Sequence, residues 1–394
     1  MVHPPVHIIA SMDTGVDDAL ALTYLLGSAD ECELSGVIAS YGNVDASTAY
    51  ANTRAVLDLF GRADIPVFLG SEHPSWADAF IPDAGCAQFH GEDGLGNTWL
   101  AGARALAGGA ADGTSESTDV IDGVVSVGGY LVGDVHAHPA VGVCSRVDRT
   151  RSVGHPQSAS RTAPASGGMR GCSVDAVDGI EALIEQVREF ERDVTVLATG
   201  PLTDVDAAIT RAPDIASKLK LVMMGGSLTQ PGNCWDAVAE TNIIQDPEAA
   251  NRVFHSGADV TMVGLDVTHQ CLLPQSAADQ WRATGTERGR FLAELADFSI
   301  KANLEADPTL FSGGMPLHDP LAAAVAIDTS LVNCFDIALR AETKTGDCTG
   351  VRGRTVGDPV GLVDTAMSRV HVALGVDLGR FLGEFVGRVM RVCR

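Results

Sequence analysis

The chain has 394 residues, of which 45% are hydrophobic, and it carries a formal net charge of −24. This length is within reach of one large domain with an extensive core. The acidic balance argues against nucleic acid and anionic membranes as partners, because both attract basic patches.

The N-terminus and the cysteines both favour an intracellular protein. Residues 1–5 have neither the charged nor the apolar region of a signal peptide, and no uncharged apolar run is long enough to span a bilayer. Nine cysteines are scattered without a CxxC pair, which favours free thiols in a reducing compartment over a disulfide framework or a zinc site. They are Cys32, Cys86, Cys144, Cys172, Cys234, Cys271, Cys334, Cys348 and Cys393. We therefore expect a cytoplasmic location.

The first predicted element is a short apolar strand that ends at Asp13. A glycine-containing turn follows, and Asp17 and Asp18 then open a run with apolar residues at helical spacing. Ligands of open α/β sheets bind beyond the carboxyl ends of the strands. Clustered carboxylates repel one another unless a cation lies among them, and Ca²⁺ and Mg²⁺ prefer oxygen ligands. The alternative is that Asp17 and Asp18 only favour a helix N-terminus through its dipole.

Strands and helices alternate along the rest of the chain. The pattern predicts strands at 34–40, 65–70, 194–198, 219–224, 259–265, 335–342 and 370–376. It predicts helices at 46–60, 176–190 and 291–305 and from 378, with further helices before 219 and after 242. This alternation indicates an α/β protein with an open, Rossmann-like, mostly parallel sheet that has helices on both faces.

Residues 101–173 interrupt this pattern. They are rich in Ala, Gly and Ser at first, and later form a basic tract rich in Ser and Pro. Because such a tract has little to bury, we expect loop or disorder. We interpret it as a long inserted loop at the surface of a single domain that spans 1–394, or as sequence that the mature protein does not need. A docking segment is the alternative.

Several polar segments lie between the predicted elements. The glycine-rich loop at 90–96 is not a Walker sequence, because no Gly-Lys-Ser/Thr follows. Taken singly, Thr199 and His318 would be turn residues. In the same way Asn233 and Asn242 would cap helices and Glu240 would be solvated.

Taken together and in order, these segments resemble the nucleoside hydrolase family, also called inosine–uridine preferring nucleoside hydrolases. The family signature DxDPGxDD corresponds to residues 11–18 here. Further similar segments are Tyr41-Gly42-Asn43, His90-Gly91, Ala198-Thr199-Gly200-Pro201-Leu202-Thr203, Met224-Gly225-Gly226, Asn233, Ala239-Glu240-Thr241-Asn242, Gly264-Leu265-Asp266-Val267-Thr268-His269-Gln270, His318-Asp319-Pro320 and Arg352-Gly353-Arg354-Thr355. The resemblance covers about 6–100 and 174 to near the C-terminus.

The resemblance implies Ca²⁺-dependent hydrolysis of the N-glycosidic bond of uridine- or inosine-like ribonucleosides, which yields ribose and the free base. It implies a Ca²⁺ held by Asp13, Asp18, the Thr199 carbonyl and Asp319. Asp13 would also take the proton from the attacking water, and His318 would protonate the leaving base. The small-molecule substrate would be bound by Asp17, Asn43, His90, Met224, Asn233, Glu240 and Asn242. The resemblance further implies a homodimer or homotetramer.

The chain departs from the family pattern at three positions. The first acid of the signature is Ser11, the usual proline is Thr14, and Thr241 stands where the family often has an aromatic residue near the nucleobase. We expect the metal ligands to remain and a supporting hydrogen bond to change. The base preference is open, and Asn303 is a further candidate for contact with the base. His318 separates the chain from the family branch that stacks purines between tryptophans.

Two rival interpretations remain. Residues 11–14 loosely resemble Mg²⁺-dependent phosphatases with an aspartyl nucleophile, although that class needs a second Asp at position 15, which is Gly. The second rival interpretation is a catalytically impaired relative that binds nucleosides or sugars.

Overall fold

A computed structural model describes residues 4–82, 84–98, 100, 178–234, 238–345, 351–364 and 366–394. The predicted insertion at 101–173 lies outside these residues. In chain order the elements are β1 (Val6–Met12), α1 (Val16–Leu26), β2 (Cys32–Ala39), α2 (Ala46–Leu59), β3 (Val67–Leu69), α3 (Ala84–His90), α5 (Gly179–Phe190), β4 (Val194–Ala198), α6 (Thr203–Arg211), β5 (Lys220–Met224), α7 (Thr241–Gln245), α8 (Pro247–Phe254), β6 (Asp259–Val263), α9 (Leu265–Thr268), β7 (Leu272–Leu273), α10 (Gln275–Arg282), α11 (Glu287–Ala306), β8 (Met315–Pro316), α12 (His318–Ile327), β9 (Val332–Ile337), β10 (Leu339–Ala341), β11 (Thr355–Gly357), α13 (Pro359–Val363), β12 (Val370–Val376) and α14 (Leu378–Cys393).

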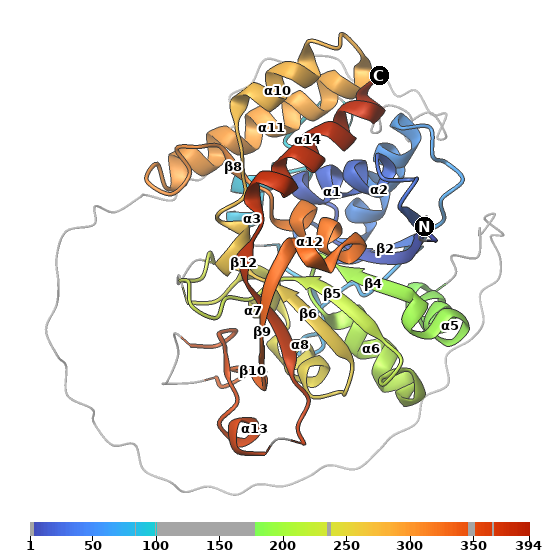
Figure 1. The fold of residues 1–394 in the computed structure, drawn as a ribbon, viewed down its shortest axis with the longest axis vertical. Coiled ribbons are helices and arrows are strands. Elements are labelled where there is room, and N and C mark those ends of the chain that lie inside the picture. Colours follow the sequence, from blue (N-terminus) through green and yellow to red (C-terminus); the bar gives the residue numbers. More distant parts are fainter. Residues whose placement is uncertain are drawn as a thin grey trace, which may run out of the picture. The chain divides into compact units, whose positions relative to one another are not determined.

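Within the described residues, eight strands form one twisted sheet in the order β3-β2-β1-β4-β5-β6-β12-β9 (Figure 1). All neighbouring strands run parallel except β9, which is antiparallel to β12 at the edge of the sheet. The predicted open, mostly parallel α/β fold is confirmed. The strand order reverses direction between β1 and β4, so the crevice beyond these two strands is where such a sheet binds ligands.

Helices cover both faces of the sheet, as predicted. On one face α1, α10, α11, α12 and α14 pack together around a core that includes Trp281 and Phe385 (Figure 1). On the other face α5, α6 and α8 pack around a second core that includes Leu183 and Phe254. Strand β1 contributes to both cores, because its alternate residues face opposite sides of the sheet.

The structure corrects two predicted elements. The single strand expected at 335–342 is two strands, since β9 belongs to the main sheet and β10 pairs with β11. His318 and Asp319 were expected at a strand-to-loop corner, but they occupy the first turn of α12. Pro320 is compatible with this position because the first turn of a helix does not need its N–H group. Helix α10 was not predicted.

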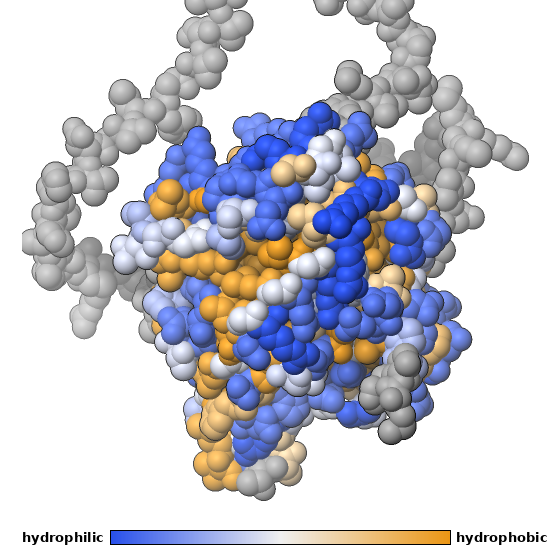
Figure 2. All heavy atoms as spheres, turned by 45° about the horizontal axis from the view of Figure 1, so that its top comes forward, coloured by the Kyte–Doolittle hydropathy of each residue, from blue (hydrophilic) through white to orange (hydrophobic). Residues whose placement is uncertain are grey.

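The described cysteines agree with the prediction that the chain has no disulfide framework. None of the six cysteines that the structure describes forms a disulfide bond, and four of them are buried. Exposed apolar side chains gather on α13, at the lower tip in Figure 2; they are Val360, Leu362 and Val363. Among the described helices none is both long and apolar enough to cross a bilayer.

Candidate active site

Asp13 lies directly after β1 at the switch point of the sheet, and its side chain is fully buried. Its Oδ2 accepts a hydrogen bond from the backbone N–H of Asn43 at 2.7 Å. A Cβ atom at Gly42 would lie 2.0 Å from this oxygen, so the close approach of the backbone requires glycine. Oδ1 of Asp13 is buried and has no hydrogen-bond partner within the described part of the chain.

Asp18 is held from three sides. Its Oδ1 accepts from the Thr199 hydroxyl at 2.6 Å, and its Oδ2 accepts from the Gly15 N–H at 2.8 Å. The Asn43 amide donates to the same Oδ2 at 3.3 Å. Thr199 follows β4, so this bond joins the start of α1 to the end of β4 at the switch point. The structure thus places these two predicted segments side by side.

Asp319 in α12 completes a cluster of buried carboxylates with Asp17 and Asp18. One carboxylate oxygen from each residue lies within 4.8 Å of the others. Burial raises the pKa of Asp17, and burial followed by the charge of Asp17 raises the pKa of Asp18 to about 6. The pKa of Asp319 is raised well above its usual value by burial and by the charges of Asp17 and Asp18. Three carboxyl groups are thus held together where burial disfavours their charged forms.

These residues fit a hard divalent cation. The donors are carboxylate oxygens, as Ca²⁺ and Mg²⁺ prefer, and Oδ1 atoms of Asp13 and Asp17 are both buried without a hydrogen-bond partner in the described residues. A cation would satisfy these atoms and offset the repulsion that raises their pKa values. The family resemblance assigns Asp13 to the metal and Asp17 to the sugar. In the structure it is Asp17 that lies with Asp18 and Asp319.

A second wall of the site is built around α7. Asn242 donates from Nδ2 to the carbonyl oxygens of Thr199 at 2.7 Å and Met224 at 3.2 Å. Glu240 caps α7, accepting from the N–H groups of Asn242 and Ile243. It is buried rather than solvated, and burial raises its pKa to about 7.

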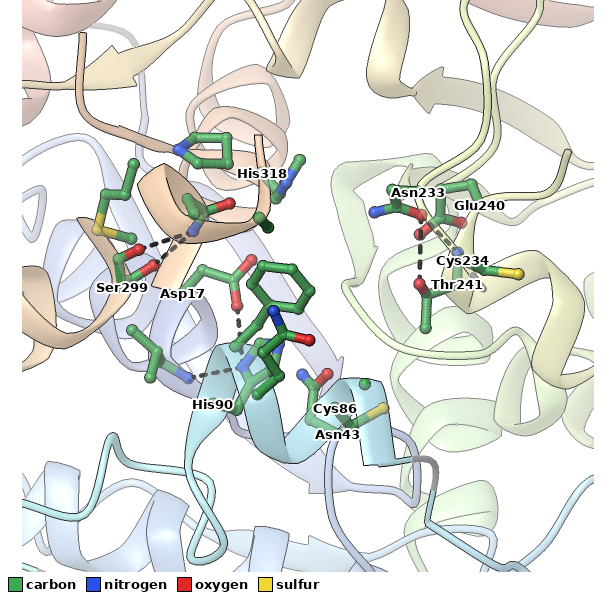
Figure 3. Close-up of a pocket in the computed structure, with 18 of the residues that line it drawn as sticks. Asp17, Asn43, Cys86, His90, Asn233, Cys234, Glu240, Thr241, Ser299 and His318 are labelled. Carbon is green, nitrogen blue, oxygen red and sulfur yellow. Dashed lines mark hydrogen bonds and ion pairs between the residues drawn. The ribbon is translucent and has the colours of Figure 1, made fainter. Parts of the chain in front are cut away.

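Asn233 joins this wall from the loop before α7. Its Oδ1 accepts from the backbone N–H of Thr241 at 3.1 Å and from the hydroxyl at 3.2 Å. In Figure 3, Asn233, Glu240 and Thr241 lie together across the pocket from Asp17, Asn43 and His90. The two walls are therefore opposite sides of one site.

Two histidines flank the carboxylates. His90 ends α3, and its Nδ1 accepts from the Val16 N–H at 3.2 Å and lies 3.7 Å from Oδ1 of Asp17. Burial lowers the pKa of His90 to about 4. His318 lies at the start of α12, with Nδ1 2.8 Å from the Thr268 hydroxyl. Burial and then the neighbouring His269 hold the pKa of His318 well below its usual range.

Most of these groups line one cavity of about 520 Å³, a size that suits a small organic ligand. Two of the predicted site residues, Asp13 and Asp18, lie behind the lining. The other predicted site residues line the cavity; they are Asp17, Asn43, His90, Thr199, Met224, Asn233, Glu240, Asn242, His318 and Asp319. Asn303 also lines it, as expected for a base contact. Its Nδ2 donates to the Ser299 carbonyl at 2.9 Å.

Sequence reasoning missed several lining residues. His269 stacks edge-to-face against both His318 and Phe311, with ring centroids 5.6 Å apart in each case. Ser299 lies one helical turn before Asn303 on α11, so the i,i+4 spacing was a signal that could have found it. Phe311, in the loop after α11, offered no such signal.

The departures from the family signature have structural partners. The Ser11 hydroxyl donates to Oδ2 of Asp204 at 2.8 Å, so the supporting hydrogen bond differs while the acidic corner is retained. Thr14 forms a buried 2.7 Å hydrogen bond with Thr53.

The fold and the site define an α/β protein with a cluster of buried carboxylates beside a cavity at its topological switch point. The sequence matches the family model of the inosine-uridine preferring nucleoside hydrolases over residues 8–383. The chain therefore belongs to this family, and by that membership it is an N-glycosyl hydrolase.

Individual relatives agree on the family and differ in the base they name. The pyrimidine-specific ribonucleoside hydrolase RihA of Enterobacter sp. (strain 638) is 31% identical over 374 residues, covering 95% of this chain and 93% of that protein. The solved structure of a purine-preferring ribonucleoside hydrolase from Gardnerella vaginalis is 34% identical with a TM-score of 0.73, covering 98% and 99% of the two chains. The plant nucleoside hydrolase PpNRh1 is 26% identical with a TM-score of 0.72, over 98% and 99%. These matches favour a nucleoside hydrolase over an aspartyl-nucleophile phosphatase.

Proposed function

We propose that this protein hydrolyses the N-glycosidic bond of ribonucleosides and depends on Ca²⁺ to do so. One observation carries the proposal. Asp17 and Asp319 of the carboxylate cluster line the same cavity as the imidazole of His318, and Asp18, the third member of the cluster, lies directly behind them. Hydrolysis of a nucleoside needs an activated water at the sugar and a proton for the departing base, and these groups offer both.

Asp13 is the proposed general base. Its Oδ2 is occupied by the Asn43 N–H, which leaves the buried Oδ1 to accept a proton from the attacking water. The raised pKa of Asp13, caused by burial and by the charge of Asp18, makes its carboxylate a stronger base. When bound, Ca²⁺ supplies the Lewis acidity that eases deprotonation of this water. Asp18, Asp319 and the Thr199 carbonyl are its other proposed ligands.

The polar groups around the cavity would hold the ribose. Asp17 accepts hydrogen bonds from sugar hydroxyls in this proposal. Asn242, fixed by the Thr199 and Met224 carbonyls, would bind the sugar from the α7 wall. Glu240 and Asn233 face the 5′ side from the opposite wall, while Asn43 and His90 close the site next to Asp17. Orientation by several fixed groups contributes to the rate because it keeps the reacting atoms aligned.

His318 is the proposed proton donor to the base. If the Thr268 hydroxyl donates to Nδ1, the proton of the neutral ring resides on Nε2, which is then the atom offered to the leaving base. Because the pKa of His318 is low, the resting ring is neutral at neutral pH, and the imidazolium that would give its Nε2 proton to the base is a stronger acid than that of an ordinary histidine.

The test is base release from a panel of purine and pyrimidine nucleosides, followed by chromatography. We expect cleavage that EDTA abolishes and that Ca²⁺ restores. Hydrolysis of p-nitrophenyl phosphate without nucleoside cleavage would instead identify a phosphatase. Saturable nucleoside binding without base release would identify the catalytically impaired relative.

We also propose a homodimer or homotetramer and a cytoplasmic location, as the family resemblance and the free thiols suggest. Light scattering coupled to size-exclusion chromatography measures the oligomeric state directly.

A further inference from the structure

Another buried carboxylate lies outside the cavity lining, beneath the strand ends that build the site. Asp204, in the first turn of α6, is fully buried. Its Oδ2 accepts from the Ser11 hydroxyl at 2.8 Å and its Oδ1 accepts from the Ser71 N–H at 2.7 Å. The Ser40 hydroxyl donates to the Ser71 carbonyl at 3.4 Å, and the hydroxyls of Ser40 and Ser71 also interact with this carboxylate.

The three serines come from three neighbouring strands. Ser11 lies in β1, Ser40 directly follows β2, and Ser71 follows β3. These strands and β4, which precedes α6, are adjacent in the sheet in the order β3-β2-β1-β4. Asp204 therefore joins the carboxyl ends of four adjacent strands through a single side chain.

The carboxylate is packed as well as hydrogen-bonded. A Cβ atom at Gly70 would lie 2.5 Å from Oδ2 of Asp204, so the backbone of the β3 end passes directly over this oxygen. Each of its hydrogen-bonding partners named above is a donor. An amide at residue 204 would keep the volume but would turn one acceptor into a donor facing those same groups.

Two short paths lead from Asp204 to the catalytic corner. Along β1, the Ser11 carbonyl accepts from the Thr199 N–H at 2.9 Å, and Asp13 is two residues further on. Along β2, the Ser40 N–H donates to the Met12 carbonyl at 2.9 Å, and Asn43, which holds Asp13, is three residues further on. The segments that place Asp13 and Thr199 are thus tied to Asp204 on both sides.

We propose that Asp204 is a positioning residue for the reaction. It fixes the strand ends that carry Asp13 and the Thr199 carbonyl, and it supplies from α6 the acid that the family signature places at residue 11 of β1. The hydrogen bond between Ser11 and Asp204 joins the strand position that lacks the acid to the helix residue that carries one. The part of the test that measures kcat rests on the nucleoside hydrolysis proposed above.

The test compares Asp204→Asn with Ser11→Asp/Asp204→Asn, which returns the acid to residue 11. Val187→Ala is the matched control, because Val187 is fully buried on α5 in the second core and removing its methyl groups lowers stability without touching the site. The measurements are kcat and KM for the cleaved nucleoside, the melting temperature, and Tb³⁺ luminescence titrated against Ca²⁺.

We expect Asp204→Asn to lose about tenfold to a hundredfold in kcat, since small misplacements of reacting groups have effects of this size. We expect Tb³⁺ and Ca²⁺ affinity to fall about tenfold, as for other groups that support metal ligands. Val187→Ala should lower the melting temperature yet keep kcat and ion affinity. The double variant should recover most of both losses.

The proposal is overturned if Asp204→Asn and Val187→Ala show the same kcat and the same ion affinity, or if the double variant is no better than Asp204→Asn. Should Asp204→Asn not fold, Ser11→Ala/Ser40→Ala removes two donors and keeps the carboxylate; unchanged kcat and ion affinity there would equally reject it. Failure of the unmodified protein to cleave any nucleoside would reject the proposed function instead, and the ion titrations of the variants would still judge the role of Asp204.

Discussion

The backbone N–H of Asn43 occupies one carboxylate oxygen of Asp13 at 2.7 Å, while the other oxygen of Asp13 is buried without a partner in the described residues. The two atoms of one side chain thus have different environments. One anchors Asp13 to the loop after β2, and the other remains available for chemistry.

Asp13→Asn should lower kcat by a factor of about 10²–10⁴, which is the usual contribution of a general base. The fold should persist, because an amide oxygen can still accept from the Asn43 N–H and the volume is unchanged. Steady-state rates and the melting temperature measure the two effects. Asp64→Asn, at an exposed ion pair with Arg62, is the control and should change neither. Near-normal turnover by Asp13→Asn would rule out the assigned role.

Removal of the metal should make stability depend on pH. Burial raises the pKa of Glu240 to about 7 and the pKa values of Asp13 and Asp319 well above their usual range. Above the pKa of these groups in the unfolded chain, the folded state therefore binds more protons than the unfolded state, and stability falls as the pH rises through the folded pKa values. His90, whose pKa burial lowers to about 4, has the opposite effect only below about pH 6.5.

Between about pH 6.5 and 8 we therefore expect the melting temperature in EDTA to fall. Ca²⁺ should raise it and flatten the slope, because the ion binds the charged carboxylates of the folded state alone. Differential scanning calorimetry at several pH values measures both effects. Identical slopes with EDTA and with Ca²⁺ would show that the carboxylates do not share an ion.

His318→Gln should distinguish substrates by their leaving group. Loss of the proton donor should lower the rate on uridine or inosine by about 10²–10⁴, but p-nitrophenyl riboside should lose much less because nitrophenolate leaves without protonation. His371→Gln, at a surface histidine on β12, is the control. Equal losses on both kinds of substrate would argue against proton donation.

Asn303→Ala should act on recognition of the base. Its Nδ2 is held by the carbonyl and hydroxyl of Ser299, which leaves its Oδ1 as the acceptor offered to an N–H group of the base. We expect KM for uridine and inosine to rise about tenfold, the value of one hydrogen bond in a buried site, with KM for p-nitrophenyl riboside unchanged. Leu304→Ala, at the exposed neighbour on α11, is the control. A uniform rise in KM for every substrate would point to a distorted pocket.

Much of the fold follows from local patterns. The bounds of β4 and β12 and the start of α14 agree with the predicted ones, because each apolar run is bounded by turn or capping residues. His318 was expected at a strand-to-loop corner, beside Asp319 and Pro320, although proline is tolerated in the first turn of a helix. The division between β9 and β10 depends on which partner strand each one meets, and that information is not local.

The site was predictable where short motifs carry the chemistry, as for Asp13, Asp18, Thr199 and Asp319. The partner of Ser11 was not, because Asp204 is 193 residues away in the chain and nothing near Ser11 points to it. The grouping of Asp17 with Asp319 likewise depends on how α1 and α12 pack.

The carboxylate cluster has a consequence for how the chain reaches its native state. Of the proposed carboxylate ligands, Asp13 and Asp18 lie near the start of the chain and Asp319 near its end, so no nascent or partly folded chain that lacks α12 contains the complete set. An ion that requires all three carboxylates can stabilise only conformations in which both ends have met. It should therefore slow unfolding and leave the early steps of folding unchanged. The ion would thus stabilise the contact between the two ends of the chain only after that contact has formed.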